Sequence, residues 1–309
     1  MTGGCWVLRC WVLGAVLGAG VLGAAVPGAA QGRITNVKTE TRSAAQGLDR
    51  EVRALVARGT VTWIGYRVPM IAGPRQMCCY DSISDGGACC GTCRLEGGGG
   101  VTMSTGSTGD ARGSRIALEP PTEFLILARV EGGAMMRVRT FTPDCDIDGS
   151  GMPLVWLTDV RPDDSVAWLS SLVTGAGAGT DRVDHVVNPA LSALAFQSGQ
   201  PATEALIGFA RNSPVTRVRG QALFWLAHKA GQQAVATITN AIENDPETDV
   251  KKRAVFALSQ LPKDEGVPKL MDVARTNRNA EVRKQAMFWL GQSKDPRAVK
   301  FFEDILLKK

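Results

Sequence analysis

The chain has 309 residues, of which 44% are hydrophobic and 21% charged, and its formal net charge is +5. This composition is typical of folded globular proteins and excludes an intrinsically disordered chain. At about 150 residues per domain, the chain is long enough for two domains. Lysine and arginine are not gathered into a stripe with a nucleic-acid-binding motif, so we expect no nucleic-acid partner.

The amino end has the pattern of a secretory signal peptide. Arg9 is the only charge before an apolar run from Cys10 to Val26, and small residues follow at Gly28 and Ala30. We therefore predict a signal peptide over residues 1–30, cleaved after Ala30. An uncleaved anchor remains the alternative, because the run is long enough to span a bilayer. Cleavage would place the mature protein in the periplasm or outside the cell, without a membrane span.

Residues 31–59 form an N-terminal segment in which LDREVRALVA predicts one short amphipathic helix. From Thr60 the pattern changes to strands, beginning with TVTWIGYRVPMI, which is rich in Val, Ile and aromatic residues. Residues 60–160 are therefore predicted to be a small, mostly antiparallel β domain that contains the cysteines. The Gly/Ser/Thr-rich stretch GGGGVTMSTGSTGDARGS is expected to be a loop within it.

A hairpin is predicted where Gly132-Gly133 separates the two apolar runs of EFLILARVEGGAMMRVRTF. In its second arm, Met136, Val138 and Thr140 are expected on one face. Arg137 and Arg139 are expected on the other, exposed face.

Six cysteines remain after signal cleavage: Cys78, Cys79, Cys89, Cys90, Cys93 and Cys145. An even number in an exported chain predicts three disulfides, whose pairing the sequence leaves open. A metal site is the alternative, with Cys89, Cys90 and Cys93 as ligands, because Cys90-x-x-Cys93 has zinc-ligand spacing. The same pair has the spacing of a redox couple. Either chemistry would make the β domain an enzyme or a metal-binding module.

Asp144-x-Asp146-x-Asp148-Gly149 has the spacing that opens a calcium-binding loop. Position twelve of such a loop requires a bidentate Glu, and here it is Val155. We therefore expect an acidic turn between strands. No cofactor or metal is predicted for the chain as a whole.

Residues 161–185 are predicted to be a connecting helix, PDDSVAWLSSLV, and a glycine-rich linker. Beyond it, a phrase of the form V-x-x-x-A-x-x-x-L recurs at intervals of 32 residues, beginning at Val186, Val218, Val250 and Val282. Spacing of four places these residues on one helical stripe. A fixed period of this length is typical of solenoids. We predict four helix pairs over residues 186–309, and an α+β multidomain fold overall.

Further positions also follow the period. The second helices are expected to bury Leu206, Ile238, Leu270 and Phe302. Small and large residues alternate at Ala193, Trp225, Ala257 and Trp289, which would keep the volume between neighbouring helices constant. Three cap-then-proline pairs are expected in first helical turns: Ser213-Pro214, Asp245-Pro246 and Asp295-Pro296.

The segment VRKQAMFWLGQSKDPRAVKFFEDIL, from Val282 to Leu306, resembles the HEAT-like repeats of phycobilisome lyases. With the signal peptide and the cysteines, the chain is similar to secreted or periplasmic bacterial HEAT-repeat proteins. This resemblance implies protein–protein interaction through a solenoid surface. The His-Glu pairs of the HEAT-like deoxyhypusine hydroxylase have no counterpart here. The two histidines are His185 and His228, and His228 is expected to complement a helix C-terminus.

Phe224, Phe256 and Phe288 also recur every 32 residues, and on a helical wheel they point away from the Val-Ala-Leu stripe. Two interpretations remain open. The three rings form an exposed strip for a protein partner, or they fill the seam between neighbouring first helices. We expect a non-enzymatic, exported scaffold that binds another protein, with the enzyme or metal-binding module as the alternative.

Overall fold

The computed structural model describes residues 33–72, 77, 93–96, 121–175, 182–229 and 231–307. The predicted signal peptide, the Gly/Ser/Thr-rich loop and Cys78, Cys79, Cys89 and Cys90 lie outside these described residues.

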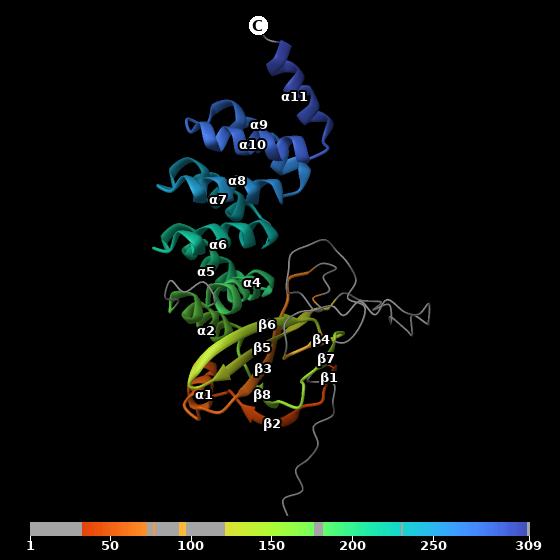
Figure 1. Cartoon of the computed structure of the whole chain (residues 1–309), viewed down its shortest axis with the longest axis vertical. Coiled ribbons are helices and arrows are strands. Elements are labelled where there is room, and N and C mark those ends of the chain that lie inside the picture. Colours follow the sequence, from red (N-terminus) through yellow and green to blue (C-terminus); the bar gives the residue numbers. More distant parts are fainter. Residues whose placement is uncertain are drawn as a thin grey trace, which may run out of the picture. The chain divides into compact units, whose positions relative to one another are not determined.

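The described strands form two sheets (Figure 1). The five-stranded sheet has the order β2-β8-β3-β5-β6, and the three-stranded sheet has the order β1-β7-β4. The strands span β1 Arg33–Thr35, β2 Lys38–Ser43, β3 Thr62–Pro69, β4 Cys93–Arg94, β5 Glu123–Glu131, β6 Ala134–Phe141, β7 Asp146–Asp148 and β8 Pro153–Thr158.

The larger sheet is mixed, which corrects the prediction of a mostly antiparallel domain. β3, β5 and β6 pair antiparallel, whereas β8 lies between β2 and β3 and is parallel to both. Both pairings of the smaller sheet are parallel as well. The hairpin signal identifies only pairs that adjoin in sequence. Parallel pairs join distant segments and have no such local signal.

The inner strands β3 and β5 of the larger sheet are buried on both faces, because their alternating side chains enter two different cores. In β3, Ile64 and Tyr66 join the core shared with the helices, while Trp63 enters the core beneath the smaller sheet. In β5, Ile126 and Leu127 divide in the same way. This explains why these strands have almost continuous apolar sequences.

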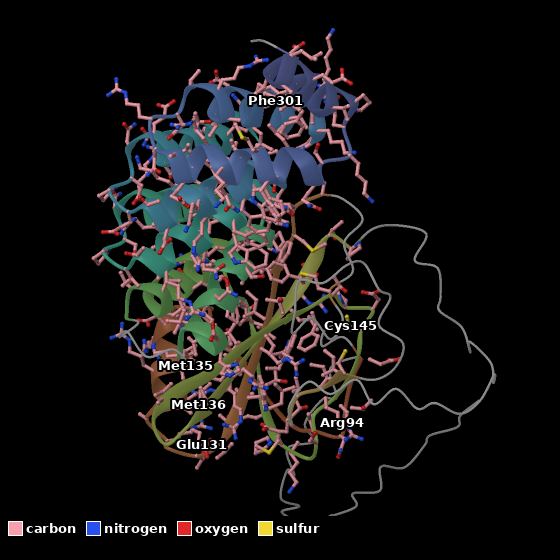
Figure 2. The ribbon with its side chains drawn as sticks, turned by 45° about the horizontal axis from the view of Figure 1, so that its top comes forward. Arg94, Glu131, Met135, Met136, Cys145 and Phe301 are labelled. Atoms are coloured by element: carbon pink, nitrogen blue, oxygen red, sulfur yellow. The ribbon has the colours of Figure 1, made fainter. Side chains whose placement is uncertain are left out.

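The β5–β6 hairpin is confirmed. Gly132 and Gly133 have φ values of 56° and 77°, as a tight two-residue turn requires. The alternation predicted for the second arm holds from Arg137 to Thr140, but the place predicted for Met136 is wrong, because Met136 is an extra residue in the ladder. Val130 pairs with Met135 and Arg129 with Arg137, which leaves Met136 45% exposed in a bulge. Figure 2 shows Glu131, Met135 and Met136 together at this end of the hairpin.

Arg139 also differs from the prediction, because its side chain is buried. Its guanidinium donates to the carbonyl oxygen of Arg94 and lies 4.9 Å from the ring centroid of Phe141. A buried guanidinium needs such partners to offset the loss of its hydration.

Two helices flank the larger sheet. α1 (Leu48–Val56) is amphipathic as predicted and buries Leu48, Val52 and Leu55. α2 (Pro162–Thr174) begins at a proline and carries two aspartates in its first turn, as the connecting helix was expected to do.

Four antiparallel helix pairs follow, and this confirms the prediction from the period of 32. Neighbouring first helices contact one another in chain order, as Figure 1 shows for α4, α6, α8 and α10. The four Val-Ala-Leu stripes are buried throughout. The pairs are α4 Asn188–Phe196 with α5 Gln200–Asn212, α6 Thr216–Lys229 with α7 Gln232–Asn244, α8 Thr248–Ser259 with α9 Lys263–Thr276, and α10 Ala280–Gln292 with α11 Pro296–Leu307.

The first pair begins irregularly. Val183–Val187 form one π-helical turn, η1, before α4, so Val186 precedes the regular helix. Pro189 has no amide hydrogen and cannot make the usual α-helical bond there. This difference accounts for the loose match of the first repeat to the others.

The last pair departs from the period by one residue. Phe301 is buried, whereas Phe302, which the period predicts in the core, is only partly buried. Figure 2 shows where Phe301 lies near the carboxyl end. The guanidinium carbon of Arg275 stands 4.8 Å from the ring centroid of Phe301.

The cap-then-proline prediction is right for one site of three. Pro296 is the first residue of α11, but Pro214 and Pro246 precede α6 and α8 by two residues. The preceding side chains nevertheless accept backbone N–H groups two residues on. Asp245 accepts from Glu247 and Asp295 accepts from Arg297, each at 2.9 Å. These are turn contacts of the Asx type.

Candidate functional site

Two rings of the predicted phenylalanine ladder stack within the seam between first helices. Phe224 and Phe256 stack with centroids 5.6 Å apart and planes 9° apart, and Phe256 contacts Trp289 at 4.7 Å. Phe224 is therefore buried and Phe256 partly buried, while Phe288 is 52% exposed. The three rings do not form the continuous exposed strip that one interpretation required.

The two tryptophans at the alternating position pack differently. Trp225 is buried, contacts Phe196 at 5.7 Å, and donates from Nε1 to Oδ1 of Asn188 at 2.9 Å. Trp289 is only partly buried, and its Nε1 has no hydrogen-bond partner among the described residues. The place of Asn188 in that later repeat is taken by Lys252, whose ammonium only donates.

The helices α6 and α8 pack closely at Gly220, which has no side chain to hold them apart. A Cβ on Gly220 would lie 2.2 Å from Cδ of Arg253, so the arginine stem lies directly against the α6 backbone. One repeat later, Lys252 and Gln285 occupy the equivalent places. Because neither is a glycine, the α8 and α10 side chains are not brought together in this way.

A groove lies along this α8–α10 seam, which we call the α8–α10 groove. It consists of two hollows with Trp289 in the wall of both. The more enclosed hollow, of about 240 Å³, is lined by the α8–α9 turn and the end of α10, including Leu258, Ser259, Lys263, Gly266 and Ser293. The more open hollow, of about 460 Å³, is lined by Asp249, Lys252, Arg253, Phe256 and Gln285.

The charges at this groove are mostly positive. Nζ of Lys252 lies 3.0 Å from Oδ1 of Asp249, and its hydrogen bond lowers the pKa of that carboxyl. Arg253 is exposed nearby, and Lys263 stands exposed at the enclosed end. Among the residues that line the groove there are thus one carboxylate and three cations, with aromatic and aliphatic surface between them.

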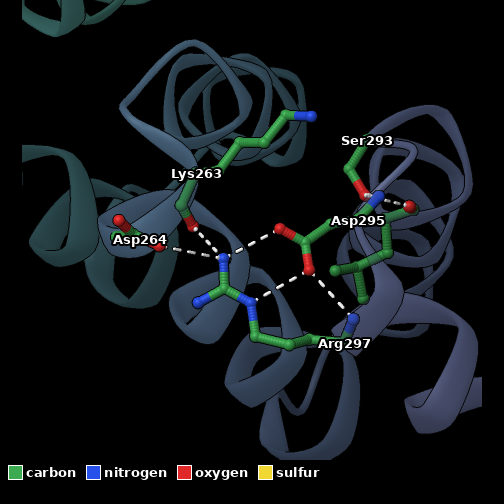
Figure 3. A network of polar contacts seen from close by, with 6 residues as sticks. Lys263, Asp264, Ser293, Asp295 and Arg297 are labelled. Carbon is green, nitrogen blue, oxygen red and sulfur yellow. Dashed lines mark hydrogen bonds and ion pairs between the residues drawn. The ribbon is translucent and has the colours of Figure 1, made fainter.

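A polar network holds α11 against the start of α9 close to the enclosed hollow (Figure 3). The guanidinium of Arg297 bonds Asp295 at 2.8 Å and the carbonyl oxygen of Lys263 at 3.1 Å. These contacts, chiefly the hydrogen bond from Arg297, lower the pKa of Asp295 to about 2. Figure 3 shows the Lys263 side chain extending away from the network.

A half-buried lysine at the end of α6, Lys229, was missed by sequence reasoning. Nζ of Lys229 donates to the carbonyl oxygen of Leu194 at 3.1 Å and to that of Gln197. Burial lowers the pKa of Lys229 to about 8. Its only sequence signal is a cation in the last turn of a helix, which is common on solvated surfaces.

Lys229 belongs to a contact between the sheet and the first repeat. Tyr66 Oη lies 3.0 Å from Ser165 Oγ, which donates to Oε1 of Gln197 at 3.0 Å. Gln197 in turn donates to the carbonyl oxygen of Pro162 at 2.7 Å. Burial raises the pKa of Tyr66, so the phenol stays neutral in this chain. The network positions the repeats and has no open reactive group.

The two described cysteines are buried in the core beneath the smaller sheet. Cys93 and Cys145 are 2% and 1% exposed, and Sγ of Cys145 lies 3.1 Å from the carbonyl oxygen of Met77. Figure 2 shows Cys145 and Arg94 in this part of the molecule. With four cysteines outside the described residues, the three predicted disulfides and the metal alternative of Cys89, Cys90 and Cys93 stay predictions. The described residues contain no cluster of three or more His, Cys, Asp or Glu suited to a metal.

The acidic segment before β8 has the geometry of a turn. Oδ1 of Asp148 accepts from the amide of Ser150 at 2.8 Å and from Asn36 at 3.0 Å. These hydrogen bonds, the first above all, lower the pKa of Asp148. Asp146 and Asp148 lie in β7, paired with β1. Of the histidines, His185 is exposed, and Nδ1 of His228 lies 3.0 Å from the carbonyl oxygen of Phe224 near the end of α6.

Comparison with protein families identifies the helix pairs. Residues 203–288 and 235–309 each match the family model of HEAT repeats. The C-terminal helices are HEAT repeats. The match extends from within α5 to the carboxyl end. It supports the repeat fold and does not support the phycobilisome-lyase subtype that the sequence resemblance suggested. A comparison with curated proteins gives no match. Within the described residues, no helix has the length and apolarity needed to cross a membrane.

Proposed function

We propose that this chain is an exported scaffold whose HEAT repeats hold another protein. The observation that carries the proposal is the series of four helix pairs, each packed on its neighbours and each leaving side chains exposed. Repeat arrays of this kind provide extended binding surfaces, because adding pairs lengthens the surface without closing it.

The mixed sheet supports this function as an anchor for the first repeat. The hydrogen bonds from Tyr66 through Ser165 to Gln197 join β3 to the α4–α5 turn. The β-bridge between Met70 and Gln197 makes the same connection through the backbone. Buried and satisfied, these polar contacts favour one orientation of the repeat array.

Crosslinking in the native host tests the scaffold function. A tagged full-length chain should capture a defined protein after in-cell crosslinking, and a chain truncated after residue 185 should lose it. Capture that is equal with and without the repeats would assign binding to the sheet and refute the proposal.

Export is a separate part of the proposal and rests on the amino-terminal pattern. The mature protein recovered from the periplasm or medium should begin at Gln31. Thiol counting after denaturation should find none free if the six remaining cysteines form three bridges. An uncleaved amino end in a cytoplasmic fraction would remove the basis for both expectations.

A further inference from the structure

We propose that the α8–α10 groove binds an extended peptide segment in which acidic residues flank one large apolar side chain. This inference rests on the proposed scaffold function and names the chemistry of its partner. It replaces the three-ring strip as the candidate docking surface, because Phe224 is buried.

The groove results from an incomplete seam. Between α6 and α8 the Gly220–Arg253 contact is tight, and in the preceding seam Trp225 is buried and hydrogen-bonded. Between α8 and α10 the glycine is absent, Trp289 is partly exposed and its Nε1 is unpaired within the described residues. The missing glycine and the unsatisfied Nε1 leave this seam less completely packed and hydrogen-bonded than the two seams before it.

The enclosed hollow fits a single apolar side chain. Its walls include Leu258, Leu261, Val267 and Leu270 from α8, the turn and α9, together with the Trp289 ring. A volume of about 240 Å³ exceeds that of a leucine or phenylalanine side chain but is smaller than most drug-sized pockets, which begin at about 300 Å³. A peptide side chain inserted there would bury apolar surface that water now covers.

The cations at both ends specify acidic flanks. Arg253 stands at the open end and Lys263 at the enclosed end, and Asp249 is already paired with Lys252. From Arg253 to Gln260 the helix advances about 10 Å. An extended peptide covers that distance in roughly three residues. The expected motif is therefore an acidic residue about three positions from the apolar anchor.

Fluorescence anisotropy with the full-length chain tests the inference. The probe is a fluorescein-labelled peptide, Asp-Ser-Ser-Leu-Ser-Ser-Asp, compared with versions that carry Lys for Asp or Ala for Leu. We expect the acidic Leu peptide to bind at least fivefold more tightly than either control, and more weakly at higher salt. Equal binding of the three peptides, or no binding of the acidic one, would overturn the inference.

Variants locate the binding to the groove. Arg253→Glu and Ser259→Phe should each weaken binding at least fivefold, the first by charge and the second by filling the enclosed hollow. The matched control is Lys300→Glu, an exposed charge reversal on α11, which should leave affinity within twofold. Arg253→Gln keeps most of the stem against Gly220 and should show an intermediate loss with unchanged circular dichroism. Unchanged affinity in both Arg253→Gln and Ser259→Phe refutes the site.

Two further arms separate this inference from its alternatives. An oligonucleotide of twelve thymidines that displaces the peptide with comparable affinity would indicate general anion binding and overturn the claim for a peptide. In-cell crosslinking with Arg253→Glu distinguishes the inference from the scaffold function. Retained capture refutes the groove but leaves the scaffold intact, whereas capture that fails already in the unaltered chain refutes the scaffold.

Discussion

Gly266 lies in the first turn of α9, where its backbone lies against the end of α8. A Cβ at this position would lie 2.5 Å from the carbonyl oxygen of Leu258 and 3.5 Å from Cβ of Leu261. The nearest atom belongs to backbone, so it has no free rotation with which to move away. Gly266→Ala should therefore push α8 and α9 apart within the third repeat.

The size of the effect follows from two opposed contributions. Replacing a helical glycine with alanine stabilises a helix by about 0.5–1 kcal/mol through reduced chain entropy. Forcing an extra methyl group into a packed contact costs about 1–3 kcal/mol. We expect Gly266→Ala to lower the free energy of unfolding by roughly 0.5–2 kcal/mol.

The matched control is Gly208→Ala in α5, where an added Cβ meets nothing within 4 Å. It should raise the free energy of unfolding by about 0.5–1 kcal/mol. Urea unfolding followed by circular dichroism measures both changes, and amide hydrogen exchange in α8 and α9 localises the first. If both variants were stabilised equally, the close α8–α9 contact would not exist in solution and the reasoning would be wrong.

Three further predictions concern charged groups. Asp245→Ala should destabilise the protein by about 3 kcal/mol, measured by urea unfolding, because it leaves the buried guanidinium of Arg219 without its carboxylate, now at 2.8 Å. The folded-state pKa of Asp295 is lowered from 3.8 to about 2, so its stabilisation is present above pH 3.8 and is lost as pH falls through that window. In Asp295→Asn the melting temperature should therefore fall less steeply below pH 3.8 than in the unaltered chain. An equally steep fall in the variant would count against the network in Figure 3. The pKa of Lys229 is lowered from 10.5 to about 8, so the unfolded chain binds more protons between those values and stability should rise with pH there. Lys229→Met should lose that rise, whereas a rise of the same size in the variant would assign it to other groups.

The helical half of the fold was predictable because its information is local. Val218, Ala222 and Leu226 lie on one stripe by spacing alone, and their repetition every 32 residues predicts the stacking of pairs. The hairpin at Gly132 was predictable for the same reason, since two positive φ values require particular residues.

The order of strands was not predictable, because nothing in β2 or β3 indicates that β8 will lie between them. The bulge at Met136 likewise arises from pairing with β5, which the alternation of one strand does not reveal. In α11, a shift of one residue places Phe301 rather than Phe302 in the core.

The candidate site was only partly visible in the sequence. Periodicity identified Phe256 and the Trp225–Trp289 alternation, and the structure shows that both belong to seams between first helices. The groove itself depends on Gly220 in one seam and Lys252 in the next. Sequence comparison of the repeats shows that difference, but its consequence for packing requires the positions of α8 and α10.

The insertion of β8 between β2 and β3 has a consequence for synthesis. Residues 38–43 and 62–69 leave the ribosome long before residues 153–158, so the nascent strands have no central neighbour until most of the amino-terminal half has emerged. Each helix pair, by contrast, needs only the pair made just before it. Pairing strands that are so far apart in sequence is slow. Until β8 is made, the unpaired edges of β2 and β3 can pair with other strands and aggregate. A chaperone that shields nascent β segments would therefore matter more for the first half of this chain than for the second.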